Sequence, residues 1–430
     1  MKKLLFTVFA LCLAQPRLFA QEEDTNNGEK YTRFEQQPGL AKAASKVFYS
    51  EKPWSISGFG EISYVNGHLD NGISDLELTY MNLYRLSGFF GYRFSDKLIW
   101  NSEVMFEYLR DKEGNDHHEF IIEAFFDLLL SKQFNVRAGL YPLGLGYINN
   151  NDDPVMFYSV NRSDVERLII PSTWMAMGVS FYGTIAPKLS YTFGLAQGIE
   201  AAEFTSGTWL RLGREPRFEA PQTLAVNPQL IYNGVKDLSL SASAYIGQTG
   251  NKELITYEDG STKTADAMVQ LYTAYARYKK HDWELMALGS WGFLNGTEDI
   301  YHLTQARQGQ AQVLGSQTVG YLLEGGYDLL SLFNGRKFFN DKNFFIDPQN
   351  VEIPIFVRYE YINTHKNFNE ALITDDANFT MFNTDIVTVG VNFKPREEIA
   401  FKFDYQFRMS RGGLAVEEGN MFELGIGFIF

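Results

Sequence analysis

The stretch Ile399-Ala400-Phe401-Lys402-Phe403-Asp404-Tyr405-Gln406-Phe407-Arg408 alternates apolar and polar side chains almost without interruption. Successive side chains of a β-strand point to opposite faces, so this period of two predicts a strand with one aromatic face and one charged face. The same alternation recurs over residues 122–128, 238–246 and 351–361. We therefore predict a chain built from antiparallel strands that are apolar on one side and polar on the other.

Composition narrows the class of protein. The chain has 430 residues, of which 45% are hydrophobic and 21% charged. After the N-terminus it has no stretch approaching the roughly 18 to 20 apolar residues that a membrane-spanning helix needs, which excludes a multi-helix transporter. Aromatic residues reach 15%, with 36 Phe and 24 Tyr, and this composition favours strands.

Residues 1–20 have the features of a secretory signal peptide. Lys2 and Lys3 form a positive start, an apolar run follows, and Ala20 supplies a small residue for cleavage before Gln21. A lipoprotein reading at Cys12, the only cysteine, is the alternative. Cleavage would leave 35 of the 38 basic residues against 52 acidic ones, a formal charge of −17 instead of −14. Such an acidic exported chain is not expected to bind nucleic acid.

From Trp54 onward, two patterns favour a membrane barrel over a soluble sandwich. Strand ends carry aromatic residues suited to girdles at the two membrane interfaces, namely Trp54, Tyr64, Tyr92, Phe94, Trp100, Tyr108, Trp283 and Tyr361. Short links alternate with long polar ones, as short periplasmic turns alternate with long external loops in outer-membrane barrels. We expect residues 21–53 to form a periplasmic lead-in with a weakly helical patch at 39–48, and residues 54–430 to form the barrel.

The strand count and the C-terminus complete the predicted fold, an all-β transmembrane antiparallel barrel. About sixteen strands are expected, from residues 54–65 to 421–430. The long Phe-rich link at 329–349 leaves eighteen open as the alternative. A final strand ending in Phe430 resembles the signal that the barrel-assembly machinery recognises in bacterial outer-membrane proteins. A barrel of this size is too wide for wall side chains to fill, which predicts a water-filled lumen.

Alternation also predicts which charged residues face the lumen. The acidic set is Glu61, Glu103, Glu107, Glu123, Asp127, Glu352, Glu360, Asp404 and Glu423, and the basic set is Arg85, Arg93, Arg137, Arg358, Lys402 and Arg408. A confined pore magnifies the sign of its lining, so this acidic excess predicts a general or weakly cation-preferring channel. A slip of one residue in any strand would invert that strand's assignment.

Residues 135–198 resemble the O/P-type porins of Gram-negative bacteria, the family named after phosphate-selective outer-membrane channels. The similarity is carried by residues 136–140, 142–144, 153–157, 160–162, 165–167, 169–174 and 178–179, and more weakly by 391–395 and 400–406. The resemblance implies a sixteen-stranded homotrimeric channel whose third external loop folds into the lumen as a constriction. Here that loop would be residues 141–171, with the charged residues Asp152, Asp153, Arg162, Asp164, Glu166 and Arg167.

The resemblance does not extend to phosphate selectivity, because no ladder of Arg or ring of Lys matches. Arg137, Arg162 and Arg167 are the best candidates for solute contact, and the alternative is that they hold the constriction loop against the wall. Anion selectivity and a surface-exposed adhesive barrel remain the alternative functions. We expect no enzyme activity, cofactor or metal. The residues His117 and His118, with Asp116 and Glu119, and the pair Asp152 and Asp153 are better read as loop residues than as ligands.

Overall fold

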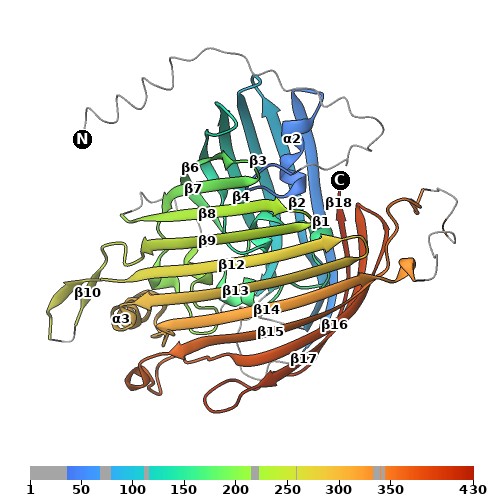
Figure 1. The fold of residues 1–430 in the computed structure, drawn as a ribbon. Coiled ribbons are helices and arrows are strands. Elements are labelled where there is room, and N and C mark those ends of the chain that lie inside the picture. The colour runs from blue at the N-terminus through green and yellow to red at the C-terminus, as the bar shows by residue number, and fades with distance from the viewer. Residues whose placement is uncertain are drawn as a thin grey trace. The chain divides into compact units, whose positions relative to one another are not determined.

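The wall of the molecule is a closed antiparallel β-barrel. The structure, a computed structural model, describes residues 36–67, 79–110, 116–214, 222–257, 259–332, 339 and 344–430, and all of these belong to one compact unit. Sixteen strands close into the barrel, and each pairs with the wall strands before and after it along the chain (Figure 1). The predicted fold class and the preferred count of sixteen strands are thus confirmed. The predicted signal peptide, residues 1–20, lies outside the described residues.

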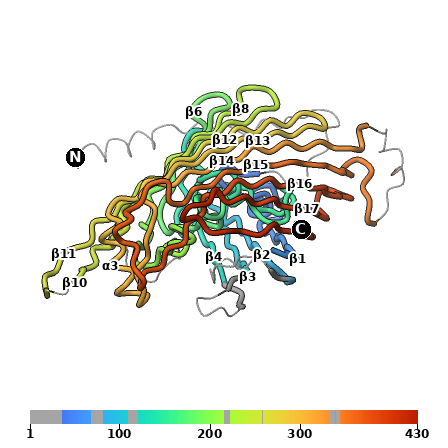
Figure 2. Tube along the Cα trace, turned by 90° about the horizontal axis from the view of Figure 1, so that it is seen from below, coloured from blue at the N-terminus to red at the C-terminus, as the bar shows by residue number. Residues whose placement is uncertain are grey.

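The wall strands are β1 (Trp54–Asn66), β2 (Thr79–Arg93), β3 (Leu98–Arg110), β4 (Asp116–Leu129), β5 (Asn135–Pro142), β6 (Met175–Ala186), β7 (Leu189–Gln197), β8 (Leu224–Val235), β9 (Leu238–Gln248), β12 (Met268–Lys280), β13 (Trp283–Asn295), β14 (Gln317–Asp328), β15 (Pro354–Asn367), β16 (Asn383–Arg396), β17 (Ile399–Ser410) and β18 (Met421–Ile429). The short strands β10 (Leu254–Thr256) and β11 (Thr262–Thr264) pair outside the wall. Helix α2 (Lys42–Tyr49) precedes β1, and helix α3 (Thr297–Gln308) lies near the β10–β11 hairpin (Figures 1 and 2). Among the described residues, no helix has both the length and the apolar character needed to cross a membrane.

Side chains alternate across the wall as the sequence predicts. On β17, Phe403 and Phe407 are exposed on the outer face, whereas Lys402, Asp404 and Arg408 are buried on the inner face. The other alternating stretches behave in the same way, with an apolar outer face exposed on β4, β9 and β15. A soluble protein would bury such a face, so the outer surface is suited to contact with lipid.

The Phe-rich link between β14 and β15 is an elaborated turn, because these two strands are direct neighbours in the wall. Within its described part, Phe345 packs on Phe393 and Phe401 with ring centroids 6.2 and 6.0 Å apart. Phe345 therefore extends the apolar outer face at the end of the barrel that carries the short turns.

The barrel closes where β18 pairs with β1. The backbone of Phe430 exchanges two hydrogen bonds with that of Gly58, at 2.9 and 3.1 Å, so the last residue completes the ladder. The Phe430 ring lies over Gly58, where an added Cβ would come within 2.5 Å of the ring and 2.2 Å of the Ser87 carbonyl oxygen. Glycine at position 58 thus permits the close approach of neighbouring strands and of the terminal ring.

We expect Gly58→Leu to impair barrel closure, because overpacking against a backbone atom costs about 1–3 kcal/mol. The measurement is the fraction of protein that migrates as a compact barrel on a gel run without heating. Gly88→Leu is the matched control, since a Cβ at Gly88 meets nothing within 4 Å. Equal folded fractions for the two variants would contradict the role assigned to Gly58.

Candidate pore and its inner loops

The inner face of the wall carries most of the predicted pore-lining charges. Those on β1 to β5 are Glu61, Arg85, Glu103, Glu107, Glu123, Asp127 and Arg137, and those on β15, β17 and β18 are Arg358, Glu360, Lys402, Asp404, Arg408 and Glu423. All of these side chains are almost completely buried. These side chains lie on the inner side of the wall, where they contact protein groups instead of lining an open surface.

Two predicted lining residues differ from the rest. Arg93 lies at the short-turn end of β2 and donates a hydrogen bond to the Lys52 carbonyl oxygen at 3.1 Å. Glu352 precedes β15, and its Oε2 lies 3.9 Å from the Nζ of Lys394. Both side chains are only partly buried, so they belong to the rim and not to the interior.

Residues 143–174, between β5 and β6, form a loop that lies inside the barrel and is buried along almost its whole length; we call it inner loop A. Its backbone N–H groups at Gly144 and Gly146 donate to Asn227 on β8 and Thr273 on β12, at 2.9 and 3.1 Å. On the opposite side, the Val160 N–H donates to Asp404 on β17 at 2.6 Å. Inner loop A therefore crosses the lumen, close to the predicted range 141–171.

Arg85 provides the first ionic anchor of inner loop A. Its Nε donates to Glu61 at 2.7 Å, and its Nη2 donates to the Asp152 carbonyl oxygen at 3.0 Å. Its Nη1 also lies 3.4 Å from the Asp152 carboxylate. The fully buried guanidinium therefore links the wall to the loop and neutralises two carboxylates that would otherwise be buried together.

Asp164 and Arg408 form the second anchor. Arg408 on β17 contacts the Asp164 carboxylate and also Glu418, and Arg167 donates to Asp164 at 2.6 Å. Burial opposes ionisation of Asp164, but Arg167 and Arg408 outweigh it and hold its pKa well below its usual range. Arg167 thus pairs with Asp164 of the same loop. This contact fits the alternative to solute contact, in which the arginine holds the loop in place.

The remaining polar residues of inner loop A bind mainly to the loop itself. Arg162 donates to Ser172 and Thr173 at 2.8 and 2.7 Å. The Glu166 carboxylate accepts the backbone N–H groups of Tyr147 and Ile148 at 2.6 and 2.7 Å. These contacts close the loop on itself through both side chain to side chain and side chain to backbone hydrogen bonds.

Burial raises the pKa of three carboxyl groups of inner loop A. The pKa of Asp152 rises to about 7 and that of Asp153 to about 6, and desolvation is the largest cause in each case. The pKa of Glu166 rises to about 7 for the same reason, although the two backbone donors oppose the shift. The charge of inner loop A therefore changes near neutral pH.

Arg137 pairs within the wall. Its Nε lies 3.1 Å from Asp127, which also accepts the Tyr182 hydroxyl at 2.7 Å. Its guanidinium lies over the Phe125 ring, 4.8 Å from the centroid. The structure thus brings together the predicted residues Asp127 and Arg137, and it does not join Arg137 to Arg162 or Arg167 in one cluster.

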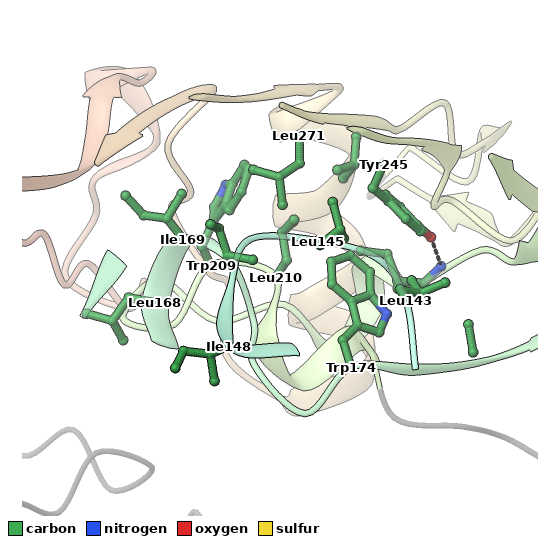
Figure 3. Close-up of a cluster of buried hydrophobic side chains, with 14 of the residues drawn as sticks. Leu143, Leu145, Ile148, Leu168, Ile169, Trp174, Trp209, Leu210, Tyr245 and Leu271 are labelled. Atoms are coloured by element: carbon green, nitrogen blue, oxygen red, sulfur yellow. Dashed lines mark hydrogen bonds between the residues drawn. The ribbon is translucent and has the colours of Figure 1, made fainter. Parts of the chain in front are cut away.

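A second loop, residues 198–214 after β7, also enters the barrel; we call it inner loop B. Figure 3 shows its Trp209 and Leu210 packed with Leu143, Leu145 and other apolar side chains of inner loop A and with Tyr245 and Leu271 of the wall. The Tyr245 hydroxyl accepts the Ile199 N–H at 3.2 Å. This apolar core inside the lumen was not predicted from the sequence. The signal that could have indicated it is the set of apolar residues within the two loops, which were expected to be polar.

Some charged residues of the wall that face the interior were not predicted. Arg277 on β12 pairs with Glu284 on β13 at 2.7 Å. Glu324 on β14 lies 3.5 Å from Arg358, and Lys394 on β16 donates to the Val155 carbonyl oxygen of inner loop A at 3.3 Å. Extending the parity assignment to residues 268–280 and 283–295 would have found Arg277 and Glu284.

The interior is narrow beside inner loop A. A small cavity between this loop and β13–β15 has a mixed apolar and charged lining that includes Met286, Glu284 and Arg358, and its volume is about 20 Å³. That volume holds about one water molecule. The loop therefore leaves little free space against this part of the wall.

Among the described residues, the groups considered as metal ligands or catalytic residues form neither a metal site nor a catalytic triad. The described residues contain no group of three or more side chains that could hold a metal ion. His117 and His118 begin β4, and their side chains lie outside the described part of the chain. A buried Ser206 and His365 lie 3.3 Å apart, but the serine hydroxyl donates to the Val313 carbonyl oxygen at 2.6 Å and the other ring nitrogen contacts Thr364. Among the described residues, no carboxylate forms a hydrogen bond with this histidine, unlike in a catalytic triad.

One comparison with a solved structure agrees with the fold. No family model matches the chain. An uncharacterized protein of Aquifex aeolicus (strain VF5) is 27% identical over 374 residues, which cover 85% of this chain and 78% of that protein. Among solved structures, the outer membrane channel DcaP of Acinetobacter baumannii has a TM-score of 0.51 at 12% identity, covering 88% of this chain and 97% of DcaP. OmpF of Salmonella typhi has a TM-score of 0.49 at 9% identity, covering 88% and 97%. The likeness to DcaP shows a shared barrel fold.

Proposed function

We propose that this protein is a porin of the outer membrane of a Gram-negative bacterium, which lets small hydrophilic solutes or ions diffuse down their gradients. The observation that carries the proposal is the closed sixteen-stranded wall, apolar and exposed outside and charged inside. A wall of this size encloses more space than its own side chains fill. The proposed channel uses no cofactor and performs no covalent chemistry.

Inner loop A is the proposed constriction of the channel. It crosses the lumen, is anchored at Arg85 and Arg408, and contributes four carboxylates, Asp152, Asp153, Asp164 and Glu166, against two arginines. Together with the eight acidic and five basic predicted residues that are buried on the inner face of the wall, this favours a general or weakly cation-preferring pore. Anion selectivity, as the name of the O/P-type family suggests, is the alternative. We further propose a homotrimer, as that resemblance implies, and delivery by the barrel-assembly machinery through the strand that ends in Phe430.

Planar-bilayer recording of the purified protein tests this function. We expect stepwise conductance in KCl and a reversal potential, under a salt gradient, that gives a cation to anion permeability ratio at or slightly above one. Heat-unfolded protein at the same concentration is the control. Absence of steps in all salts would overturn the porin and favour the alternative of an adhesive or structural surface barrel. A ratio well below one would overturn the selectivity and favour an anion channel.

A further inference from the structure

A short segment ahead of β1 lies inside the barrel. Helix α2 packs on the inner face of β1, β2 and β3, and its Ala43 and Val47 are buried. The Ser57 hydroxyl on β1 donates to the Ala43 carbonyl oxygen at 2.6 Å, and the Asn101 amide on β3 donates to that of Ala44 at 2.6 Å. Two wall residues thus hold the helix by backbone groups at the end of the barrel that carries the short turns.

The same segment also lies near strands β5 and β7, farther along the wall. The Gly39 carbonyl oxygen accepts a hydrogen bond from Arg137 on β5 at 3.5 Å, and a Cβ at Gly39 would lie 3.8 Å from Thr192 on β7. Residue 47, by contrast, lies against Gly91 on β2. Residues 36–49 therefore extend across the inner side of strands β7 to β2; we call them the lumen plug.

The lumen plug is also joined to the proposed constriction. The backbone N–H groups of Lys42 and Ala43, at the start of α2, donate to the Asp153 carboxylate at 2.7 and 3.4 Å. Gln36 donates to the Asn150 carbonyl oxygen at 2.9 Å, and Asn150 donates in return to Gly39 at 3.0 Å. A carboxylate at the N-terminus of a helix satisfies free donors and opposes the helix dipole, so Asp153 stabilises the plug in place.

We propose that the lumen plug restricts the channel. It must leave its position against β1 to β3 and inner loop A, which we call its seat, for full conductance. The inference rests on the proposed porin function. An eight-residue helix is not stable alone in water, so α2 stays folded only while the wall and inner loop A contact it. Leaving the seat therefore means loss of the helix, which makes seated and released two distinct states instead of a graded series.

Gly91 offers a direct way to empty the seat. A Cβ at this position would lie 2.4 Å from the Cβ of Val47, so Gly91→Leu places a side chain where the plug now packs. Gly88→Leu, on the same strand and in open space, is the matched control. Ala43→Trp disturbs the plug from its own side and leaves the wall intact, and Tyr49→Trp on the exposed part of α2 is its control. Migration on unheated gels confirms that each variant has a folded barrel.

The experiment has one readout for plug position and one for conduction. To follow the position of the plug, Ala44→Cys is added to each full-length variant, and the rate at which this cysteine reacts with a membrane-impermeant maleimide is measured. The same variant without Ala44→Cys gives the background rate. Ala44 is buried, and the only cysteine of the chain is Cys12. We expect labelling at least tenfold faster with Gly91→Leu or Ala43→Trp than with either control. For conduction, we expect a severalfold larger single-channel conductance in the same two variants.

The outcomes separate the plug from the porin. An unchanged labelling rate in both Gly91→Leu and Ala43→Trp would contradict the position proposed for the plug. If labelling is faster but the single-channel conductance is unchanged, the plug leaves its position without affecting conduction, and the claim that it restricts the channel is contradicted. Faster labelling with no conduction by any variant, the parent included, would overturn the porin function and the restriction with it, while the seat would stand. Faster labelling together with larger conductance supports the whole proposal.

Discussion

Replacing Arg85 by Ala is expected to release inner loop A and expose it to protease. The change leaves Glu61 and Asp152 buried without their cation, and breaking a buried pair by removing one partner costs about 3–5 kcal/mol. If that cost falls on loop docking, the undocked population rises roughly hundredfold or more. The measurement is trypsin cleavage after Arg162 and Arg167, followed by mass spectrometry of the fragments that begin at Ser163 and Leu168.

The control is Arg93→Ala, because Arg93 contacts the carbonyl groups of Ser50 and Lys52 and not inner loop A. The triple change Arg85→Met with Glu61→Gln and Asp152→Asn removes the uncompensated charges and should restore most of the resistance. Cleavage of Arg85→Ala at the parent rate would show that the ion pairs do not hold the loop.

Acidification is expected to lower the cation preference of the channel between about pH 8 and pH 5. Burial raises the pKa of Asp152 and Glu166 to about 7 and that of Asp153 to about 6, so these groups are ionised at pH 8 and neutral at pH 5. The proposed constriction thus loses up to three negative charges over this window. The measurement is the reversal potential of single channels under a fixed KCl gradient at each pH.

The same shifts carry a stability consequence of defined sign. A folded-state pKa above the unfolded one means that the native loop binds protons more tightly, so its extra stability is present below about pH 4 and is lost as the pH rises through about 7. We therefore expect noisier open-channel current at pH 9 than at pH 6. The double variant Asp152→Asn with Glu166→Gln should flatten the pH dependence, whereas Asp164→Asn should retain it, because Asp164 is ionised throughout. A permeability ratio independent of pH in the parent channel would refute this account.

The wall could be predicted from sequence because its pattern is local. Residues 399–408 show the two faces of a strand within ten positions, and the lipid-facing side leaves Phe403 and Phe407 exposed as the alternation requires. A loop folding into the lumen at residues 141–171 was predicted from family resemblance and length, and inner loop A lies close to that range. Its anchors were not predicted, because Arg85 and Asp152 lie 67 positions apart and nothing between them marks the contact.

The interior could not be predicted, because its packing depends on distant segments. Alternation over residues 238–246 does not show that Tyr245 packs on Trp174, with ring centroids 4.5 Å apart. The helical patch near residues 39–48 was recognised as α2, yet its amphipathic pattern does not say which surface it covers. Loops expected to meet water instead supply Trp209 and Leu210 to a buried core. Residues 36–49 lie against the inner face of the wall, and the periplasmic position of the rest of residues 21–53 stays a prediction.

The β1–β18 seam also bears on how the barrel closes. This pair joins the two wall strands that lie farthest apart along the chain, so the ring lacks its last rung until these distant segments meet. Until then, both edge strands carry unpaired backbone groups that invite pairing with other chains. Helix α2 is tethered to β1 by only a few residues, so it is carried to the interior by the first strand and enclosed by the last. Closure of the ring and capture of the helix are therefore steps of a single assembly sequence.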